Sequence, residues 1–252
     1  MHQKGLTVGT IRSTLSAISW HHKLNSKEDP TRHFLIMRLL LGIKKVQKKR
    51  EKQVVPISHH ILAKILEQLS FVTKENYIHK MMQAAFLLAY HGALRVGEFA
   101  KSNHLRHTIK IEDVKLYHTV TGTAMTIALQ SFKHCETGAT FRIKPSLQQK
   151  YCPVTALKTY LKLRPQKPGP LFIYPNGKPI SRRIVANTLK LCLERAGYDP
   201  EPYNTHSFRV GKASDMAITG IPEALIRRAG RWGSDAYKKY IRFSLFTMPT
   251  TN

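Results

Sequence analysis

The stretch KMMQAAFLLAYHGAL (80–94) places apolar residues on nearly every side of a helix. A helix of that kind is buried all round, so we expect it at the centre of the fold. Gly92 is expected to bend or end the helix, and Arg95 follows three residues later. An arginine beside a buried helix is unfavourable unless its charge is paired or used. This stretch therefore predicts a central helix with a paired or functional arginine at its end.

Helical patterns flank the central helix on both sides. Apolar residues at helical spacing predict helices over 6–24 and 33–47 and a third one from residue 57, with Ser58 as its N-cap. Towards the C-terminus, residues suited to a first turn or an N-cap open four more helices: Pro153, Ser181, Thr205 and Pro222. The last three of these are expected to stop at a glycine, namely Gly197, Gly220 and Gly230.

Between residues 108 and 144 the apolar period shifts towards two. The segments IKIEDVKL, TAMTIALQ and TGATFRIK alternate and are separated by turn-forming residues, which predicts a small antiparallel sheet of about three strands. Lys133, in ALQSFKHCETG, falls where a strand gives way to a hairpin turn. The fold class that follows is mostly α with a small antiparallel β-sheet (α+β).

A basic segment, KKVQKKREK (44–52), divides the chain, and Pro56 follows it. We expect a helical domain at 1–50, a basic linker at 51–56 and a second domain at 57–252. The segment is interpreted first as a solvated linker, and also as a phosphate-binding strap or nuclear address. Its basic residues are Lys44, Lys45, Lys48, Lys49, Arg50 and Lys52.

The charge of the chain predicts a polyanionic partner. Lys and Arg number 41 against 15 Asp and Glu, a net charge of +26. Nucleic acid is the commonest polyanion that such a protein meets. A membrane surface is the rival, but the apolar runs are short, and LIMRLLLGI (35–43) is broken by Arg38. We expect no membrane-spanning segment.

Neither the cysteines nor the histidines predict a metal site. The three cysteines lack CxxC spacing and fit a reducing compartment. His104-x-x-His107 has no cysteine partner at zinc-finger spacing. We expect no metal and no cofactor.

Several charged or aromatic residues could carry chemistry, and each also has a structural interpretation. Arg95 has two interpretations, as a phosphate ligand or as the ion-pair partner of Glu98, which lies three residues later on the same helical face. His206 and Arg209 lie three apart, so a helix projects both to one side as an anion site, although this spacing is common by chance. Trp232 by default is a core aromatic.

Taken together, these residues stand in an informative order: Arg95, Lys133 on a hairpin, His206-x-x-Arg209, Trp232, and tyrosines near the C-terminus. This order resembles the tyrosine recombinase (phage integrase) superfamily. The matching stretches are GALRVGEF, the Lys133 hairpin, THSFRVGKA, and GRW followed by YIR. The sequences SFKHCETG…CPVTALKTYL and GRWGSDAYKKYIR resemble in particular those of the recombinases of eukaryotic DIRS-type and Crypton mobile elements.

The resemblance implies a helical core-binding domain followed by a catalytic domain, closing together as a clamp on double-stranded DNA. It implies a cofactor-free transesterification through a 3′-phosphotyrosine. Arg95 and Arg209 would bind the phosphate oxygens, Lys133 would protonate the leaving oxygen, and His206 would bind the phosphate or help to take the phenol proton. Trp232 stands where most members have histidine, although some have tryptophan.

Two tyrosines compete for the role of nucleophile. Members of the family place it roughly nine residues after the His/Trp position; Tyr240 lies eight beyond Trp232 and Tyr237 lies five beyond it. We assign Tyr240 as the nucleophile and Tyr237 as a packing or phosphate-contacting neighbour, on a short helix that Asp235 can cap.

Three other functions compete with this interpretation. The serious alternative is a catalytically inactive, domesticated DNA-binding protein, which would keep the charge and fold. A metal-dependent transposase or nuclease needs a carboxylate cluster, and the five aspartates include no suitable strand pair. A type IB topoisomerase shares the phosphotyrosine chemistry and ranks third.

The resemblance also implies a homo-tetramer on paired DNA sites, in which the tail SLFTMPTTN either docks on a neighbouring subunit or frays. A eukaryotic mobile element predicts the nucleus as location; otherwise we expect the cytoplasm, with the DNA. Relatives carry further helices ahead of TIRSTLSAI, which suggests a truncated or mispredicted start at Met1.

Overall fold

The structure is a computed structural model that describes residues 6–47, 54–101, 108–120, 122–131, 137–145, 149–233, 235–239 and 241. The chain forms two compact units, Met1–Lys52 and Gln53–Asn252. Among the described helices, none combines the length and the apolarity that a membrane crossing requires.

The first unit contains two helices, α1 (Val8–Leu24) and α2 (Phe34–Val46), in the two segments where helical spacing predicted them. Gln47 joins their ends: its side-chain oxygen accepts from the Val8 N–H at 2.9 Å, and its amide nitrogen donates to the Leu6 carbonyl at 2.8 Å. Lys44 and Lys45 of the basic segment lie in the last turn of α2. The remaining basic residues of that segment lie outside the described residues: Lys48, Lys49, Arg50 and Lys52.

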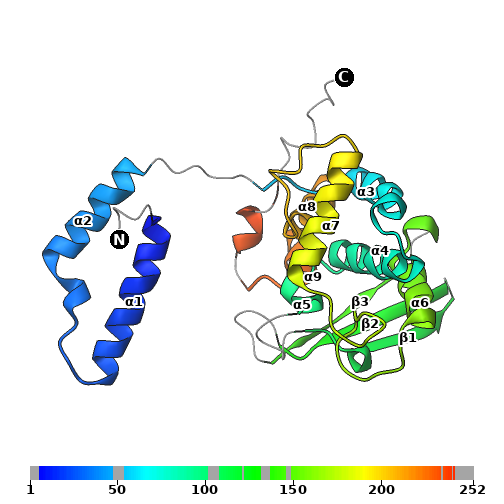
Figure 1. The fold of residues 1–252 in the computed structure, drawn as a ribbon, viewed down its shortest axis with the longest axis horizontal. Coiled ribbons are helices and arrows are strands. Elements are labelled where there is room, and N and C mark those ends of the chain that lie inside the picture. Colours follow the sequence, from blue (N-terminus) through cyan, green and yellow to red (C-terminus); the bar gives the residue numbers. More distant parts are fainter. Residues whose placement is uncertain are drawn as a thin grey trace. The chain divides into compact units, whose positions relative to one another are not determined.

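The second unit is built around α4 (Asn76–His91), which is buried over most of its length from Met81 to Tyr90. Helices α3 (His59–Val72), α6 (Pro153–Leu163) and α8 (Ser207–Ile218) pack against it. Outside these, α7 (Arg182–Arg195) packs on α3, and α9 (Glu223–Gly230) packs on α8 (Figure 1). The central position of α4 is the one that its all-round apolar sequence predicted.

One three-stranded antiparallel sheet completes this unit, in the order β1 (Val114–Thr119), β2 (Gly122–Leu129), β3 (Ala139–Ile143). Its register pairs Leu116 with Met125, and Met125 with Ile143. The middle strand β2 packs against α6 (Figure 1). The prediction of a mostly helical protein with one small antiparallel sheet is confirmed.

The predicted caps are mostly found, with one correction. Ser58 and Ser181 are N-caps whose hydroxyl oxygens accept the N–H groups of Ile61 and Ile184. Thr205 is not the cap of α8, because the Asn204 side chain captures the His206 N–H at 2.7 Å and delays the helix until Ser207.

Helix α9 ends at Gly230, as predicted. The left-handed residue after it is Arg231, with φ 56°. Glycine is needed at position 230 for space, since a Cβ there would lie 1.8 Å from the Trp232 ring.

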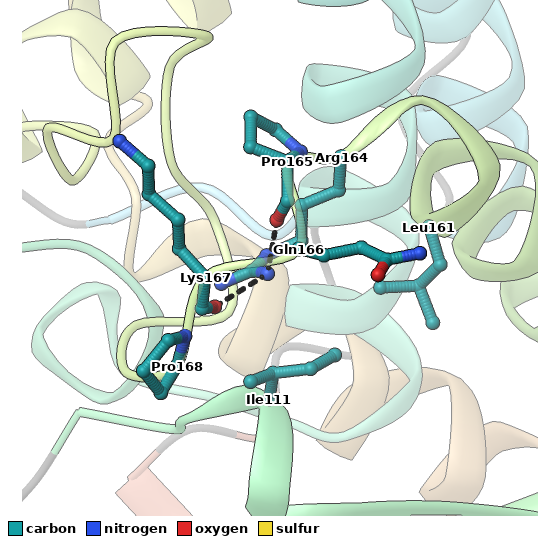
Figure 2. Close-up of a pocket in the computed structure, with 7 residues that line it drawn as sticks. All are labelled: Ile111, Leu161, Arg164, Pro165, Gln166, Lys167 and Pro168. Atoms are coloured by element: carbon teal, nitrogen blue, oxygen red, sulfur yellow. Dashed lines mark hydrogen bonds between the residues drawn. The ribbon is translucent and has the colours of Figure 1, made fainter.

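A buried arginine organises the loop after α6. Arg164 donates to four backbone carbonyls at 2.8–2.9 Å, including Leu171 through Nε and Pro165 through Nη1. It borders a pocket of about 340 Å³ (Figure 2). None of the predicted catalytic residues lines this pocket, whose walls are Ile111, Leu161, Arg164, Pro165, Gln166, Lys167 and Pro168.

Candidate active site

Arg95 lies in the tight turn that joins α4 to α5 (Val96–Phe99). Gly92 ends α4, as predicted, but the left-handed residue of the turn is Ala93, with φ 45°. A Cβ at Gly92 would lie 3.0 Å from the Leu88 carbonyl oxygen and 3.1 Å from the Phe141 ring, so a side chain there would need its neighbours to shift. A left-handed alanine is strained, so contacts elsewhere must hold the turn.

Glu98 fixes both the backbone and the side chain of Arg95. The Arg95 N–H donates to Glu98 Oε2 at 3.0 Å, and Arg95 Nη1 donates to Glu98 Oε1 at 3.0 Å. The Glu98 side chain is buried, whereas the Arg95 side chain is 29% exposed. The ion pair considered from the sequence is therefore present, and Arg95 also remains accessible to a ligand.

A second arginine, Arg231, shares Glu98, and the sequence interpretation missed it. Arg231 Nη2 donates to Glu98 Oε2 at 2.9 Å, and its side chain is only 4% exposed. No local spacing links two residues that lie 133 positions apart. The available signal was the position of Arg231 between Gly230 and Trp232 in GRW, within the group of stretches that carried the resemblance.

Arg209 lies in the first turn of α8 and is fully buried. Its Nη1 donates to the Ala93 carbonyl at 2.7 Å, and its Nη2 donates to the Gly230 carbonyl. The helix approaches the start of the second unit closely, because a Cβ on Gly211 would lie 1.8 Å from the Ile57 carbonyl oxygen. Arg209 is thus held against the same turn that carries Arg95.

His206 is the N-cap residue of α8, one turn before Arg209. Burial, together with the positive charges of Arg209 and Arg95, lowers the pKa of His206 to about 4. A neutral imidazole at pH 7 can accept a proton as well as donate one hydrogen bond.

Trp232 covers Arg209. The Arg209 guanidinium lies 4.3 Å from the centre of the indole ring, a cation–π contact. Behind Trp232, Tyr237 is fully buried, with its ring centre 6.3 Å from that of Trp232. The Tyr237 hydroxyl donates to Glu223, and burial together with this carboxylate raises the pKa of Tyr237 to about 12. Tyr237 belongs to a small apolar cluster with Ala213 and Ile226.

Lys133 and Tyr240 lie outside the described residues. The structure describes the two strands that precede and follow the Lys133 segment, β2 and β3, and a short 3₁₀ helix at Asp235–Lys239 ahead of Tyr240. Asp235 is the first residue of that helix, and its predicted capping role stays a prediction.

The structure therefore brings Arg95, His206, Arg209 and Trp232 to one place, where α4, α5, α8 and the end of α9 meet. Guanidinium groups bind the oxygens of a phosphate through paired N–H donors. Among the described residues, no group of three or more His, Cys, Asp or Glu side chains is placed to hold a metal ion. What these residues can do together is bind a phosphate group and stabilise negative charge that develops on it.

Solved structures of recombinases share the fold. The XerH site-specific recombinase bound to a palindromic difH substrate matches with a TM-score of 0.64 and 17% identity, over 94% of this chain and 64% of that chain. The Tn1549 transposon integrase in complex with circular intermediate DNA matches with a TM-score of 0.58 and 14% identity, over 97% and 78%. A lambda integrase dimer bound to a core site gives 0.53 and 15%, over 93% and 64%.

This chain spans 61% to 64% of the length of the XerH chains. No curated protein sequence was found to match it. The profile of the phage integrase family matches residues 61–242, well over half of the 252 residues, and the chain belongs to that family.

Proposed function

We propose that this protein cleaves and rejoins duplex DNA through a 3′-phosphotyrosine intermediate, as a site-specific recombinase or integrase. The observation that carries the proposal is the convergence of Arg95 and Arg209 on one turn, through Glu98 and the Ala93 carbonyl, with the neutral His206 beside them. Two guanidiniums and an imidazole make a site suited to the charge of a phosphodiester in transition.

In the proposed reaction the Tyr240 hydroxyl attacks the scissile phosphorus. A tyrosine–phosphorus bond forms, the bond from phosphorus to the 5′-oxygen breaks, and Lys133 gives that oxygen its proton. His206 takes the phenol proton or hydrogen-bonds the phosphate, while Arg95 and Arg209 bind its non-bridging oxygens. Attack by an incoming 5′-hydroxyl then reverses the step and releases the tyrosine. The two exchanges balance without a cofactor or metal.

The position of Tyr237 supports Tyr240 as the nucleophile. The Tyr237 phenol is buried and donates to Glu223, and its raised pKa, about 12, makes the phenolate harder to form. A residue that already packs against Trp232 and Ile226 is suited to support the site rather than to attack DNA.

Double-stranded DNA is the proposed partner, and a tetramer on paired sites the proposed assembly. The net charge of +26 supports a polyanionic partner, and the XerH, Tn1549 and lambda structures are complexes with DNA. The sequences of the motifs around Lys133 and Tyr240 support an origin in a eukaryotic DIRS-type or Crypton element, and with it a nuclear location.

One observation favours the second candidate function, an inactive DNA-binding protein. Arg209 is 0% exposed and its guanidinium lies against the Trp232 ring, so a phosphate reaches Arg209 only if the residues packed over it, Trp232 included, move. The active reading therefore requires DNA binding to displace the indole ring, whereas the inactive reading does not.

The two candidates are separated with nicked suicide duplexes of randomised sequence, which trap a covalent intermediate because the resealing strand is lost. We expect wild type to form a covalent protein–DNA adduct in EDTA, Tyr237→Phe to form it as well, and Tyr240→Phe to form none. A wild type that binds the duplex but forms no adduct, also when extended at its amino terminus, would establish the inactive reading.

A further inference from the structure

We infer that Arg231 is a positioning residue, which sets the orientation of Arg95 towards the scissile phosphate by occupying one oxygen of their shared partner, Glu98. This inference rests on the proposed function of the site. Only 4% of the Arg231 side chain is exposed, so Arg231 is not placed to contact the phosphate directly. Its role is to orient another residue.

The hydrogen bonds to Glu98 are divided between its two oxygens. Oε2 accepts from Arg231 Nη2 at 2.9 Å and from the Arg95 backbone N–H at 3.0 Å. Oε1 accepts from Arg95 Nη1 at 3.0 Å. Because Oε2 is occupied, Arg95 meets the carboxylate through a single nitrogen and not as a bidentate pair. The opposite edge of its guanidinium, with Nε and Nη2, is thereby directed away from Glu98.

Without Arg231, the Glu98 carboxylate would pair with the Arg95 guanidinium through both of its oxygens. A carboxylate and a guanidinium prefer the bidentate geometry, with two parallel hydrogen bonds. A buried carboxylate that loses one of two cationic partners binds the remaining one more tightly. The Arg95 guanidinium would then face Glu98, and neither its charge nor its N–H groups would be available to a phosphate.

Arg231 also holds the turn that carries Arg95. Its Nη1 donates to the Gly92 carbonyl at 2.9 Å and its Nη2 reaches the Ala93 carbonyl at 3.2 Å. Arg209 donates to the same Ala93 carbonyl at 2.7 Å. Two arginines therefore hold the carbonyl of the left-handed Ala93, and the spacing between Arg95 and Arg209 depends in part on Arg231. On its other face Arg231 stacks on the Phe141 ring, 5.0 Å from the ring centre.

The decisive variant is Arg231→Lys, because an ammonium keeps the charge but cannot reach Glu98 and two carbonyls at once. Arg231→Gln is the companion variant, which keeps a single donor nitrogen and removes the charge. Arg164→Lys is the matched control: Arg164 is likewise a buried arginine that donates to backbone carbonyls, at the pocket of Figure 2 and apart from the predicted catalytic residues.

Two measurements test the role. In single-turnover reactions with the suicide duplex, we expect Arg231→Lys to form the adduct roughly 100-fold more slowly than wild type. Displacing a catalytic group by about 1 Å has an effect of that size. Its Kd for the duplex should stay unchanged, and Arg231→Gln should be slower still. Arg164→Lys should melt at a lower temperature than wild type yet react at the wild-type rate.

The second measurement does not depend on activity. The Nε–Hε resonance of Arg95, assigned with Arg95→Lys, should shift in the ¹H–¹⁵N spectrum of Arg231→Lys and stay in place in Arg164→Lys. If the wild-type protein forms no adduct, the proposed function is disproved, and the Arg95 resonance alone tests the role of Arg231. An unshifted Arg95 resonance, or a wild-type reaction rate in Arg231→Lys, would overturn the inference. Failure of both Arg231 variants to fold would also overturn it, because the role would then be structural.

Discussion

At the scale of single residues, one backbone carbonyl organises the site. The Ala93 carbonyl accepts from Arg209 and from Arg231, and Arg95 lies two residues further on. Placing several guanidiniums together is unfavourable unless an anion joins them. Glu98 is the resident anion for Arg95 and Arg231. The phosphate of DNA would be the second one, shared by Arg95 and Arg209.

The first prediction at this scale concerns the two proposed phosphate ligands. Arg95→Ala and Arg209→Ala should each lower the rate of strand cleavage by about 100-fold to 1,000-fold, the usual effect of removing one donor to a transition state. DNA affinity should fall far less, since many other cations would contact the backbone of bound DNA. Adduct formation and a filter-binding Kd, measured on the same duplex, compare the two. Equal losses of cleavage and affinity would show that these arginines only hold the DNA backbone.

A second prediction follows from the pKa of His206, which is lowered from 6.5 to about 4 in the folded protein by burial and by the charges of Arg209 and Arg95. Between these two values the unfolded chain binds more protons than the folded one, so His206 makes stability rise with pH across that window. Acidification from pH 6.5 to 4 should remove a contribution on the order of 3 kcal/mol.

Urea unfolding at a series of pH values measures this contribution. His206→Gln should show a smaller loss of unfolding free energy on acidification than wild type. The buried His91, whose pKa is also lowered, remains in both proteins and cancels in the comparison. His60→Gln, at an exposed site, should retain the wild-type pH dependence. Parallel curves for wild type and His206→Gln would disprove the assignment.

At the scale of elements, the site depends on how closely α8 approaches the segment before α3. The Ile57 N–H donates to the Ser207 carbonyl at 3.0 Å, and Gly211 leaves no room for a side chain against the Ile57 carbonyl oxygen. This packing brings α8, and with it His206 and Arg209, up to the turn after α4.

Gly211→Ala should therefore destabilise the second unit by about 1–3 kcal/mol, as overpacking does, and it should slow strand cleavage by displacing Arg209. Gly42→Ala is the matched control, because a Cβ at Gly42 in α2 meets nothing within 4 Å. That substitution should stabilise its helix by up to about 1 kcal/mol. Urea unfolding followed by circular dichroism tests both, and a neutral Gly211→Ala would contradict the close approach of α8.

The elements were largely predictable from the sequence, whereas the contacts between them were not. Apolar spacing located α4, β2 and β3, and local capping chemistry located Ser58 and Ser181, because both signals lie within a few neighbouring residues. The segment predicted as the first strand, 109–116, overlaps β1 only from Val114, because Ile111–Asp113 forms a 3₁₀ turn. Thr205 failed as a cap because Asn204, one residue earlier, competes for the backbone. The Arg231–Glu98 pair and the Trp232 cover over Arg209 are tertiary contacts, which no periodicity encodes.

At the scale of the whole molecule, the main feature is the large excess of positive charge. A net charge of +26 over 252 residues is strongly self-repelling, and a polyanion relieves that repulsion. Described cations that are exposed in both units, such as Lys45 and Arg228, can neutralise DNA phosphates and release their counterions.

DNA affinity should consequently depend steeply on salt. If the protein neutralises at least six phosphates, its affinity for duplex DNA should fall by about 1,000-fold or more between roughly 50 mM and 200 mM salt. Fluorescence anisotropy of a labelled duplex at several salt concentrations gives the slope directly. A shallow slope would mean that few cations reach the backbone, and would count against a protein that encloses its DNA.

The central claim is that a tyrosine of this chain becomes joined to DNA, and mass spectrometry of the adduct tests it most directly. The wild-type protein would be incubated in EDTA with a nicked suicide duplex, digested with protease and nuclease, and searched for a peptide that carries a nucleotide. The account predicts the modification on Tyr240. The same modification on Tyr237 would keep the reaction but contradict the assigned nucleophile, and a DNA-bound protein without any modified tyrosine would contradict the reaction itself.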